Sequence, residues 1–467
     1  MDHKDLRKWS GEAAKWAEEY HATLRERPVR AQTNPGDTAA KLPDIAPESA
    51  EDMAAIFEDF KDIVPDAMTH WQHPRFFAYF PGNASPASML AEQLANAISA
   101  QAMLWQTAPA ANEMEEVMIR WLRDALGLSN HFTGTIHDSA TTATLSAILT
   151  MRERALGWKG ITEGLSGQPR LRLYASAETH SSVDKAARLA GIGQNNLVKV
   201  DTDLNNGMDP AALDSAITAD LVAGYLPAGV ILCVGGTSIG ATDPINACLD
   251  VAKAHNLYTH VDAAWAGSAM ICPEFRQLWT GVDKADSIVF NPHKWLGVQF
   301  DCAVQFLADP TPQKNTMGLR PEYLKTQGAE DIVNYNEWTV PLGRRFRALK
   351  IWFTLRAYGL TGLRKRIRNH VSWANEVAEV ISSLSGFTIV TAPALSLFTF
   401  QYVPEGKNPN EATARLLEKI NNDGRIYLTQ TLHDGKFVIR VQVGQFDCTQ
   451  DDVMMIPEVL SDLTRGS

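Results

Sequence analysis

The chain has 467 residues, of which 45% are apolar and 21% are charged, a composition typical of a folded globular protein. This length predicts two to three domains, or one large domain with appendages. The formal net charge of −11 at pH 7 argues against nucleic acid or an anionic membrane surface as the main partner. The charged N-terminus has no signal-peptide core, the longest apolar run is interrupted by glycine and proline, and the five cysteines form no CxxC pair. We therefore expect a cytoplasmic protein without a membrane span or a metal site.

An amphipathic helix is predicted over residues 1–27, because apolar side chains that include Trp9, Trp16 and Tyr20 recur at three- and four-residue steps. No predicted strand lies near this helix, so its apolar stripe needs another surface to cover it. It is either an arm that lies on a partner or on the main body, or a helix packed within its own subunit.

Aromatic side chains gather in residues 70–86, a segment with little regular period. Trp71, Tyr79 and Phe80 are among them and offer flat apolar surface. The segment is either a plug in the core or the wall of a pocket for an apolar or aromatic ligand.

From residue 133 onwards, apolar runs alternate with helical stretches. The runs predict strands that are apolar on both faces, over residues 171–176, 196–200, 228–234, 257–263 and 287–292. This repetition predicts an α/β fold with a mostly parallel sheet covered on both sides. We expect the next strand, at 301–309, to be antiparallel. A helical region over 343–385, followed by alternating strands around a helix at 410–422, predicts a smaller α+β domain at the C-terminus.

Two residues at the ends of neighbouring predicted strands carry the first chemical signal. Asp262, in VDAAWAG, stands where α/β folds bind ligands, and Lys294, in NPHKW, follows the next strand beside apolar side chains. Burial lowers the pKa of an amine, which suits a nucleophile or a Schiff base, and a buried carboxylate suits a pyridinium nitrogen. Each residue by itself is more often structural, but together they predict a cofactor site.

Three further segments are weak signals individually. His180, in AETHSS, follows a strand, where an imidazole can lie over a planar cofactor or act as an acid or base. Ser139, Ala140 and Thr141 stand at a predicted helix N-terminus, which can bind an anion, although such helix starts are mostly simple caps. The paired glycines of GGTSIGATDP (235–244) allow a close approach of the backbone to a ligand, or form a tight turn.

Residues 311–330 combine two prolines, two glycines and many polar side chains, which favours a mobile surface lid. Tyr323 lies in this segment. Most loop tyrosines have no catalytic role, so a role for Tyr323 depends on the other motifs.

Taken in order, the motifs HPRFFAYFP, AETHSSVDKAA, VDAAWAG, NPHKW and PLGRRFRALKIWFTLRAYG resemble the group II pyridoxal-phosphate (PLP) decarboxylases, above all the aromatic-L-amino-acid decarboxylases that act on tyrosine and tryptophan. The resemblance covers nearly the whole chain and is weaker at the C-terminus. It implies PLP fold-type I and a homodimer with active sites at the subunit interface. We accordingly predict an N-terminal helical arm at 1–62 that contacts the other subunit, a large PLP-binding domain at 63–350 and a small α+β domain at 351–467.

The resemblance also implies roles for individual residues. Lys294 would form the Schiff base, Asp262 would pair with the pyridine nitrogen, and His180 would stack on the ring opposite Ala264. Tyr323 matches the lid tyrosine that protonates the carbanion carbon after carbon dioxide leaves. The implied phosphate contacts are Ser139, Ala140 and Thr141, helped by Asn291, with His293 and Thr237 nearby. The implied substrate pocket consists of Trp71, Tyr79, Phe80, Pro81 and Gly343, with Met103 reaching in from the partner.

Three positions bear on the choice of substrate. Gly82 stands where animal enzymes often have a small hydroxylic residue, and Met103 where an aromatic residue is common, so the pocket is less defined for a catechol. Gly343 leaves space where phenol-preferring plant relatives carry serine, which favours tolerance of indole. Discrimination between apolar groups in a pocket is worth only ~1–3 kcal/mol.

We expect decarboxylation of an aromatic L-amino acid (tryptophan, tyrosine, DOPA or phenylalanine) to the corresponding amine. A decarboxylase of histidine or of an acidic amino acid is an alternative, although an aromatic wall without an obvious extra arginine argues against the acidic case. An aldehyde synthase is a second alternative, and the family resemblance associates it with phenylalanine in place of Tyr323. A catalytically silent homologue ranks last, because Lys294, Asp262, His180 and Tyr323 are all present.

Overall fold

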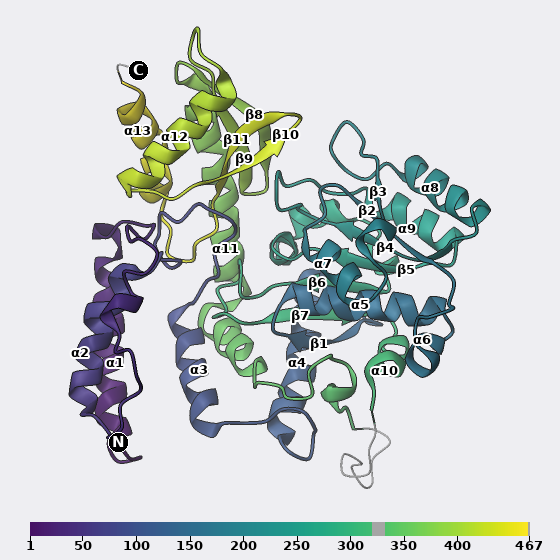
Figure 1. Cartoon of the computed structure of the whole chain (residues 1–467), viewed down its shortest axis with the longest axis horizontal. Helices are drawn as coiled ribbons and strands as arrows, with labels where there is room; N and C mark the ends of the chain where they lie inside the picture. Colours follow the sequence, from purple (N-terminus) through teal and green to yellow (C-terminus); the bar gives the residue numbers. More distant parts are fainter. Residues whose placement is uncertain (320–331, 466–467) are drawn as a thin grey trace. The chain divides into compact units, whose positions relative to one another are not determined.

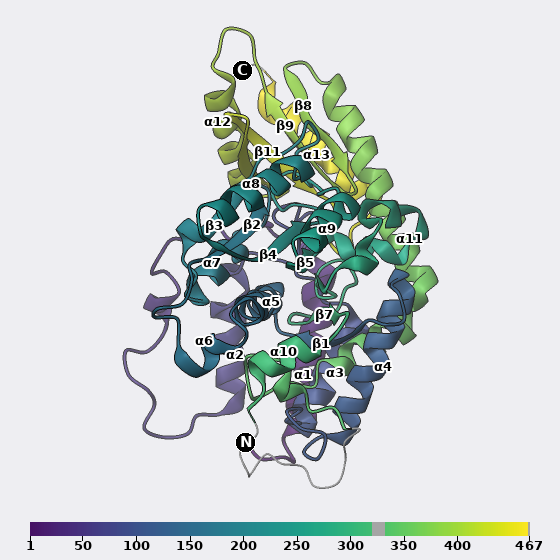
Figure 2. The ribbon, with the colours of Figure 1, turned by 90° about the vertical axis from the view of Figure 1, so that its right-hand side faces the viewer.

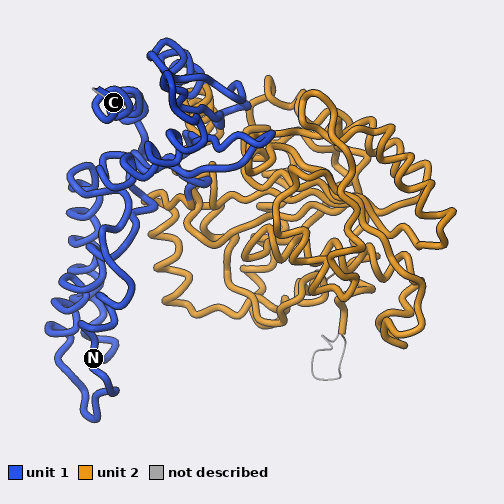
Figure 3. Tube along the Cα trace, turned by 45° about the horizontal axis from the view of Figure 1, so that its top comes forward, with its two compact units in different colours: residues 1–81, 372–467 blue, residues 82–371 orange. Residues whose placement is uncertain are grey.

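The computed structural model describes residues 1–319 and 332–465, which form two compact units (Figure 3). Residues 1–81 together with 372–467 form the unit that we call the terminal unit, and residues 82–371 form the central unit. The division of the chain at residues 62 and 350 stays a prediction.

In the described part of the central unit, seven strands form one sheet in the order β1-β7-β6-β5-β4-β2-β3 (Figure 1). Strands β2 to β6 are parallel, whereas β7 is antiparallel to both β6 and β1. The strands are β1 (Thr133–His137), β2 (Leu171–Ser176), β3 (Leu197–Val200), β4 (Leu226–Cys233), β5 (Tyr258–Asp262), β6 (Ser287–Phe290) and β7 (Ala303–Leu307). The predicted α/β fold with a mostly parallel sheet is confirmed, as is the antiparallel strand near 301–309.

Helices α4 (Pro109–Leu126), α5 (Ala140–Ala155), α8 (Pro210–Val222) and α9 (Ile245–Ala254) pack against this sheet. The central unit also contains α3 (Pro86–Ile98), α6 (Lys159–Glu163), α7 (Ser182–Leu189), α10 (Thr311–Met317) and the first part of α11 (Ala348–Ser383). Helix α5 packs across β4, β5, β6 and β7 (Figure 2). Its buried residues Ala140, Ala143 and Ala147 are small, which lets the helix approach the strands closely.

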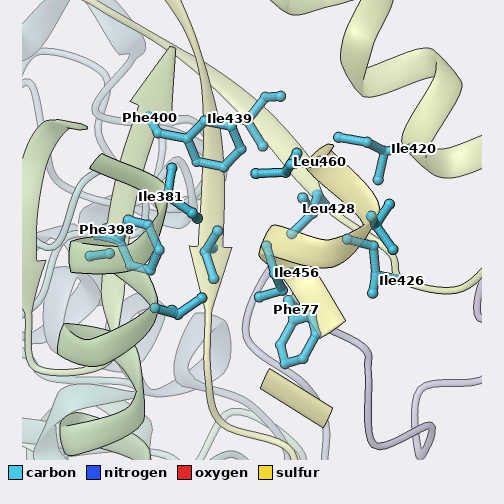
Figure 4. Close-up of a cluster of buried hydrophobic side chains, with 14 of the residues drawn as sticks. Phe77, Ile381, Phe398, Phe400, Ile420, Ile426, Leu428, Ile439, Ile456 and Leu460 are labelled. Carbon is cyan, nitrogen blue, oxygen red and sulfur yellow. The ribbon is translucent and has the colours of Figure 1, made fainter. Parts of the chain in front are cut away.

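The terminal unit contains an antiparallel sheet in the order β10-β11-β9-β8. Its strands are β8 (Phe387–Ala394), β9 (Leu397–Tyr402), β10 (Thr429–His433) and β11 (Lys436–Gln442), and its helices are α1 (Leu6–Thr23), α2 (Met53–Ile63), α12 (Pro409–Asp423), α13 (Gln450–Thr464) and the last part of α11. Phe398, Phe400 and Ile439 on the sheet pack with Ile381 and Leu460 on the helices (Figure 4). The predicted smaller α+β region at the C-terminus is therefore present.

Two properties of the whole described chain bear on its surroundings. None of the helices in residues 1–319 and 332–465 is long and apolar enough to cross a membrane. All five cysteines lie in these ranges, and each is buried with a free thiol.

Candidate active site

A cavity of about 190 Å³ opens at the carboxyl ends of the parallel strands of the central unit. It is lined by Ser139, Ala140, Thr141, His180, Ser182, Cys233, Gly235, Gly236, Thr237, Asp262, Ala264, Trp265, Asn291 and Lys294. Every residue that we predicted to contact a cofactor is in this lining except His293. Segments far apart in the sequence meet here because parallel strands end at one edge of the sheet.

Asp262 and Lys294 reach the cavity from adjacent strands. Asp262 is the last residue of β5, only 6% exposed, and its Oδ1 accepts a hydrogen bond of 3.0 Å from the backbone N–H of Ala264. Lys294 follows β6, in a turn closed by its own N–H donating to the carbonyl of Asn291 over 2.9 Å. Because β5 and β6 are paired in parallel, the carboxylate and the amine reach the same cavity.

The turn that carries Lys294 is held by a distant segment. The N–H of Asn83 donates to the carbonyl of His293 over 2.9 Å, and its side-chain amide donates to the carbonyl of Lys294 over 2.6 Å. The N–H of Ser85 also donates to the carbonyl of Gly297 over 2.9 Å. These bonds fix the backbone from which the Lys294 side chain extends. We did not predict Asn83, because no local pattern reveals a pairing across 211 residues.

His180 has a defined tautomer. The backbone N–H of Ser182 donates to its Nδ1 over 3.1 Å, and the Ser182 hydroxyl lies 2.8 Å from the same atom. Nδ1 therefore accepts, so the proton of the neutral ring is on Nε2. Burial lowers the pKa of His180, Asp262 opposes that effect, and Lys294 adds to it. At neutral pH the ring is a flat, uncharged donor in the cavity wall.

The N-terminus of α5 forms another part of the wall. Ser139 caps the helix, with its hydroxyl oxygen 3.3 Å from the N–H of Thr142. The first N–H groups of a helix lack partners within it and carry partial positive charge, so this end suits an anion. Gly236 lies nearby in the lining, and a Cβ there would be 3.0 Å from the carbonyl oxygen of Glu178. A glycine is therefore favoured at this position.

Asn291 and His293 frame the Lys294 turn. The Oδ1 of Asn291 is buried and has no hydrogen-bond partner among the described residues, although its side chain lines the cavity. A bound polar group would satisfy this atom. The Nδ1 of His293 accepts from the N–H of Cys302 over 2.8 Å, and burial lowers the pKa of His293 to about 3. An amine, a carboxylate, a helix N-terminus and an unsatisfied amide together fit a cofactor with an aldehyde, a ring nitrogen and a phosphate.

The residues predicted for the substrate pocket are not among those that line this cavity, and their role stays a prediction. Gly343 lines a separate cavity of about 340 Å³, together with Gln101 and Arg345, and Met103 lines neither. The predicted residues Trp71, Tyr79, Phe80 and Pro81 belong to the terminal unit. There Trp71 and Tyr79 are 41% and 47% exposed and stack with ring centroids 5.7 Å apart, whereas Phe80 is buried against Gly444.

The predicted lid lies partly outside the described residues. Tyr323 is one of the residues that the structure does not describe. Residues 311–317 differ from our expectation of a mobile surface segment, because they form helix α10 and bury Gln313. The Gln313 amide exchanges hydrogen bonds with Gln305 and donates to the carbonyl of Trp338 over 2.7 Å, which anchors the helix.

The chain is similar to a known protein family and to several of its members. Residues 35–403 match the family model described as the pyridoxal-dependent decarboxylase conserved domain. The chain is 36% identical to phenylacetaldehyde synthase of Arabidopsis thaliana, covering 95% of this chain and 92% of the relative, and 36% identical to tryptophan decarboxylase 2 of Oryza sativa subsp. japonica, covering 95% and 91%. A crystal structure of Oryza sativa TDC with PLP and tryptamine superposes with a TM-score of 0.96 at 32% identity, covering 100% of this chain and 98% of that chain.

These matches confirm the family resemblance, the fold type and the cofactor expected from the sequence motifs. They span nearly the full length of the chain and of the proteins it matches. The chain therefore belongs to the pyridoxal-dependent decarboxylases, carboxy-lyases that use pyridoxal phosphate, and is related to the aromatic amino acid decarboxylases.

Proposed function

We propose that this protein removes the carboxyl group of an aromatic L-amino acid and releases the corresponding amine and carbon dioxide. The single observation that carries the proposal is the meeting of Lys294, Asp262 and the α5 N-terminus in one buried cavity. When bound, pyridoxal phosphate supplies an electron-withdrawing ring that accepts the electron pair left by the departing carboxylate.

The residues of the cavity would each hold one part of the cofactor. The Lys294 amine attaches it to the chain, and the Asp262 carboxylate keeps a proton on its ring nitrogen. His180 and Ala264 would contact the two faces of the ring, and the Nε2–H of His180 would donate to a substrate oxygen. The phosphate would be held by Ser139, Ala140, Thr141, Thr237, Asn291 and His293.

Aromatic specificity is supported by the relatives and by the exposed ring pair. Tryptophan decarboxylase 2 of rice is named for an indole substrate, and phenylacetaldehyde synthase of Arabidopsis for an aromatic product. Trp71 and Tyr79 stack with their planes 20° apart and are nearly half exposed, which offers flat apolar surface to a ligand.

We also propose a homodimer. On α3, Leu90, Leu94 and Ile98 are 51%, 42% and 65% exposed, and their four-residue spacing places them on one face of the helix. Helix α1 has 18 residues and none is buried, although Trp16 packs edge-on against Phe60 of α2. A second copy of the chain that covered both faces would remove this apolar surface from water. The five buried free thiols support a reducing compartment, the cytoplasm.

The test of the activity is product identification. Purified protein with pyridoxal phosphate is offered tryptophan, tyrosine, DOPA, phenylalanine, histidine and glutamate separately, and the products are identified by mass spectrometry. We expect aromatic amines to form fastest. Histamine or γ-aminobutyrate as the sole product would overturn the substrate class, and no product from any of the six would favour a silent homologue.

A second candidate, the aldehyde synthase, is favoured by the similarity to phenylacetaldehyde synthase. We prefer the decarboxylase because residue 323 is tyrosine, whose hydroxyl can return a proton to the substrate carbon. Tyr323→Phe should therefore divert most of the product from amine to aldehyde, with consumption of oxygen and release of ammonia and hydrogen peroxide. Product ratios from the variant and the unchanged protein, run side by side, check this. An unchanged amine yield would remove Tyr323 from this role.

A further inference from the structure

A row of buried polar side chains crosses four neighbouring strands of the central sheet. It consists of His137 on β1, Gln305 on β7, Ser287 on β6 and His260 on β5, and it ends at Thr144 on α5; we call these five residues the polar belt. Each of the five is at most 2% exposed. Burying so many polar groups is costly unless each finds a partner, and the roles assigned above use none of them.

The hydrogen bonds of the polar belt have fixed directions, set at one end by Gln313. Because the Gln313 amide N–H donates to the carbonyl of Trp338, its Oε1 faces Gln305 and accepts from the Gln305 Nε2 over 3.0 Å. The same Nε2 donates to the Ser287 hydroxyl oxygen over 2.9 Å. The Gln305 Oε1 accepts from the Nε2 of His137 over 2.8 Å. The orientation of the Gln305 amide is therefore determined.

The donors and acceptors can also be assigned at the other end of the polar belt, from Ser287 to Thr144. The Ser287 hydroxyl accepts from Gln305, and Nδ1 of His260, 2.9 Å away, is the acceptor within reach of its own proton among its contacts in the described residues, so we assign the donation to Nδ1. The proton of a neutral His260 is then on Nε2, which donates to the Thr144 hydroxyl over 3.2 Å. Burial lowers the pKa of His260 to about 4, with Asp262 opposing the shift, so the ring is neutral at pH 7.

The belt ends on both sides of the turn that we assign to the phosphate. His137 is the last residue of β1, directly before Asp138 and Ser139, and Thr144 lies one helical turn after Ala140. His260 stands two residues before Asp262 on β5, so both side chains project from the same face of the strand. The belt thus joins the β1–α5 turn to the strand that carries the Asp262 carboxylate.

We infer that His260 is a positioning residue. Because it bonds Thr144 and Ser287 at the same time, it sets the distance between the β1–α5 turn and Asp262. This distance in turn sets the spacing between the anion and the cationic ring nitrogen that the site holds. The identity of the ligand rests on the proposed function. The neutral imidazole also leaves the charge of Asp262 to the ligand, since a protonated His260 would compete for it.

Two threonines of α5 provide a matched test. Thr144 and Thr150 are both fully buried, but the Thr150 hydroxyl donates to the carbonyl of Ser146 in its own helix over 2.8 Å. Thr→Val at either site removes a hydroxyl with little change of volume. We expect Thr144→Val to weaken pyridoxal phosphate binding about tenfold, because it leaves the His260 N–H unpaired, and Thr150→Val to leave it within about twofold. Thr144→Ser, which keeps the hydroxyl, should restore affinity.

The affinity is measured by titrating each protein, freed of cofactor, with pyridoxal phosphate and following visible absorbance and tryptophan fluorescence. The same titration with pyridoxal, which has no phosphate, separates positioning from general damage. Pyridoxal cannot contact the β1–α5 turn and Asp262 at the same time, so it should bind to Thr144→Val and to the unchanged protein with equal affinity. Equal losses for both ligands, or equal affinities of Thr144→Val and Thr150→Val for pyridoxal phosphate, would overturn the inference.

Ser287→Ala tests the other end of the relay. Without the Ser287 hydroxyl, Nδ1 of His260 loses its partner and nothing on the β6 side orients the ring, so its bond to Thr144 is no longer held in place. Ser287→Ala should therefore weaken pyridoxal phosphate binding, and the double variant with Thr144→Val should be no weaker than either single variant. Additive losses would contradict a relay through His260. If Thr144→Val does not fold, unchanged affinity in Ser287→Ala would overturn the inference by itself.

The titrations also keep this inference separate from the proposed function. If the unchanged protein binds pyridoxal phosphate but decarboxylates none of the six amino acids, the proposed activity fails and the belt is still tested by affinity. If the activity is found and the two threonine variants bind the cofactor equally, the belt inference fails and the activity stands.

Discussion

Both sheets bury apolar side chains against their helices, but the central sheet adds a row of hydrogen-bonded polar side chains to its apolar core. In the terminal unit, Phe398, Phe400 and Ile439 present an apolar surface to α11, α12 and α13. In the central unit, the polar belt crosses four strands beneath a helix whose N-terminus opens into the cavity. Apolar contacts are non-directional and tolerate changes of shape that conserve volume, whereas a hydrogen-bonded row is directional, and the loss of one member leaves another without a partner. The difference teaches that precision in this protein is concentrated where the ligand binds.

The sharpest contrast comes from a residue of the cavity. Lys294→Ala should lower turnover by roughly 10³-fold or more and abolish the visible absorbance of the bound cofactor, because it removes the amine that attaches the cofactor. The free energy of unfolding should change by less than about 1 kcal/mol. Lys284→Ala is the control, since Lys284 lies in the same unit, partly exposed and paired with Asp250. If Lys294→Ala keeps its turnover and its visible absorbance, another amine attaches the cofactor.

The terminal unit should respond in the opposite way. Phe400 is fully buried in the apolar cluster, so Phe400→Ala should lower the free energy of unfolding by about 3–5 kcal/mol. The kcat of the protein that remains folded should stay within about twofold of the original. Urea unfolding followed by circular dichroism measures the first quantity, and Leu432→Ala, at a side chain that is 71% exposed, is the control. A large fall in kcat without loss of stability would break the comparison.

A smaller effect is the response of the polar belt to acid. Burial lowers the pKa of His137 to about 4, below the ordinary 6.5. Below pH 6.5 the unfolded chain binds a proton here that the folded chain does not, so this contribution to stability is present above pH 6.5 and is lost as the pH falls towards 4. The slope is about 1.4 kcal/mol per pH unit.

His137→Gln keeps a donor for Gln305 and removes the titration. Urea unfolding between pH 6 and pH 5 should therefore show a pH slope that is smaller than that of the original protein by about 1.4 kcal/mol per unit. Identical slopes for the two proteins would mean that His137 takes up a proton in the folded state.

The sequence predicted the parts of the fold that depend on apolar runs. Strands β2 to β6 follow near-continuous apolar segments, and all five were expected. Strands β1 (TGTIH) and β10 (TQTLH) were missed, because both are rich in polar and hydroxylic residues, a composition that is typical of loops. The buried residue His137 ends β1, and its partner Gln305 is 168 residues away, so no local pattern marks this segment as a strand.

The residues of the candidate site also fall into those that the sequence predicted and those that it missed. Asp262, Lys294 and His180 were found because motifs of unusual composition end three strands or begin a helix, and all three line one cavity. Asn83 and the polar belt were missed, since their importance comes from partners in distant segments. Reactive residues can be recognised from the sequence when they lie in short motifs. The hydrogen bonds that hold those motifs in place join distant segments and exist only in the folded chain.

The place of β1 in the sheet has a consequence for synthesis of the chain. Its partner is β7, with His137 opposite Ala303, so β1 emerges from the ribosome about 170 residues before the strand that it pairs with. At 5–20 residues per second this is a wait of roughly 10–30 s. During that time the turn at Ser139 has no sheet to hold it, although α5 directly follows. The cofactor site therefore cannot form on the growing chain before residue 307 has emerged, at which point about a third of the 467 residues are still to be made.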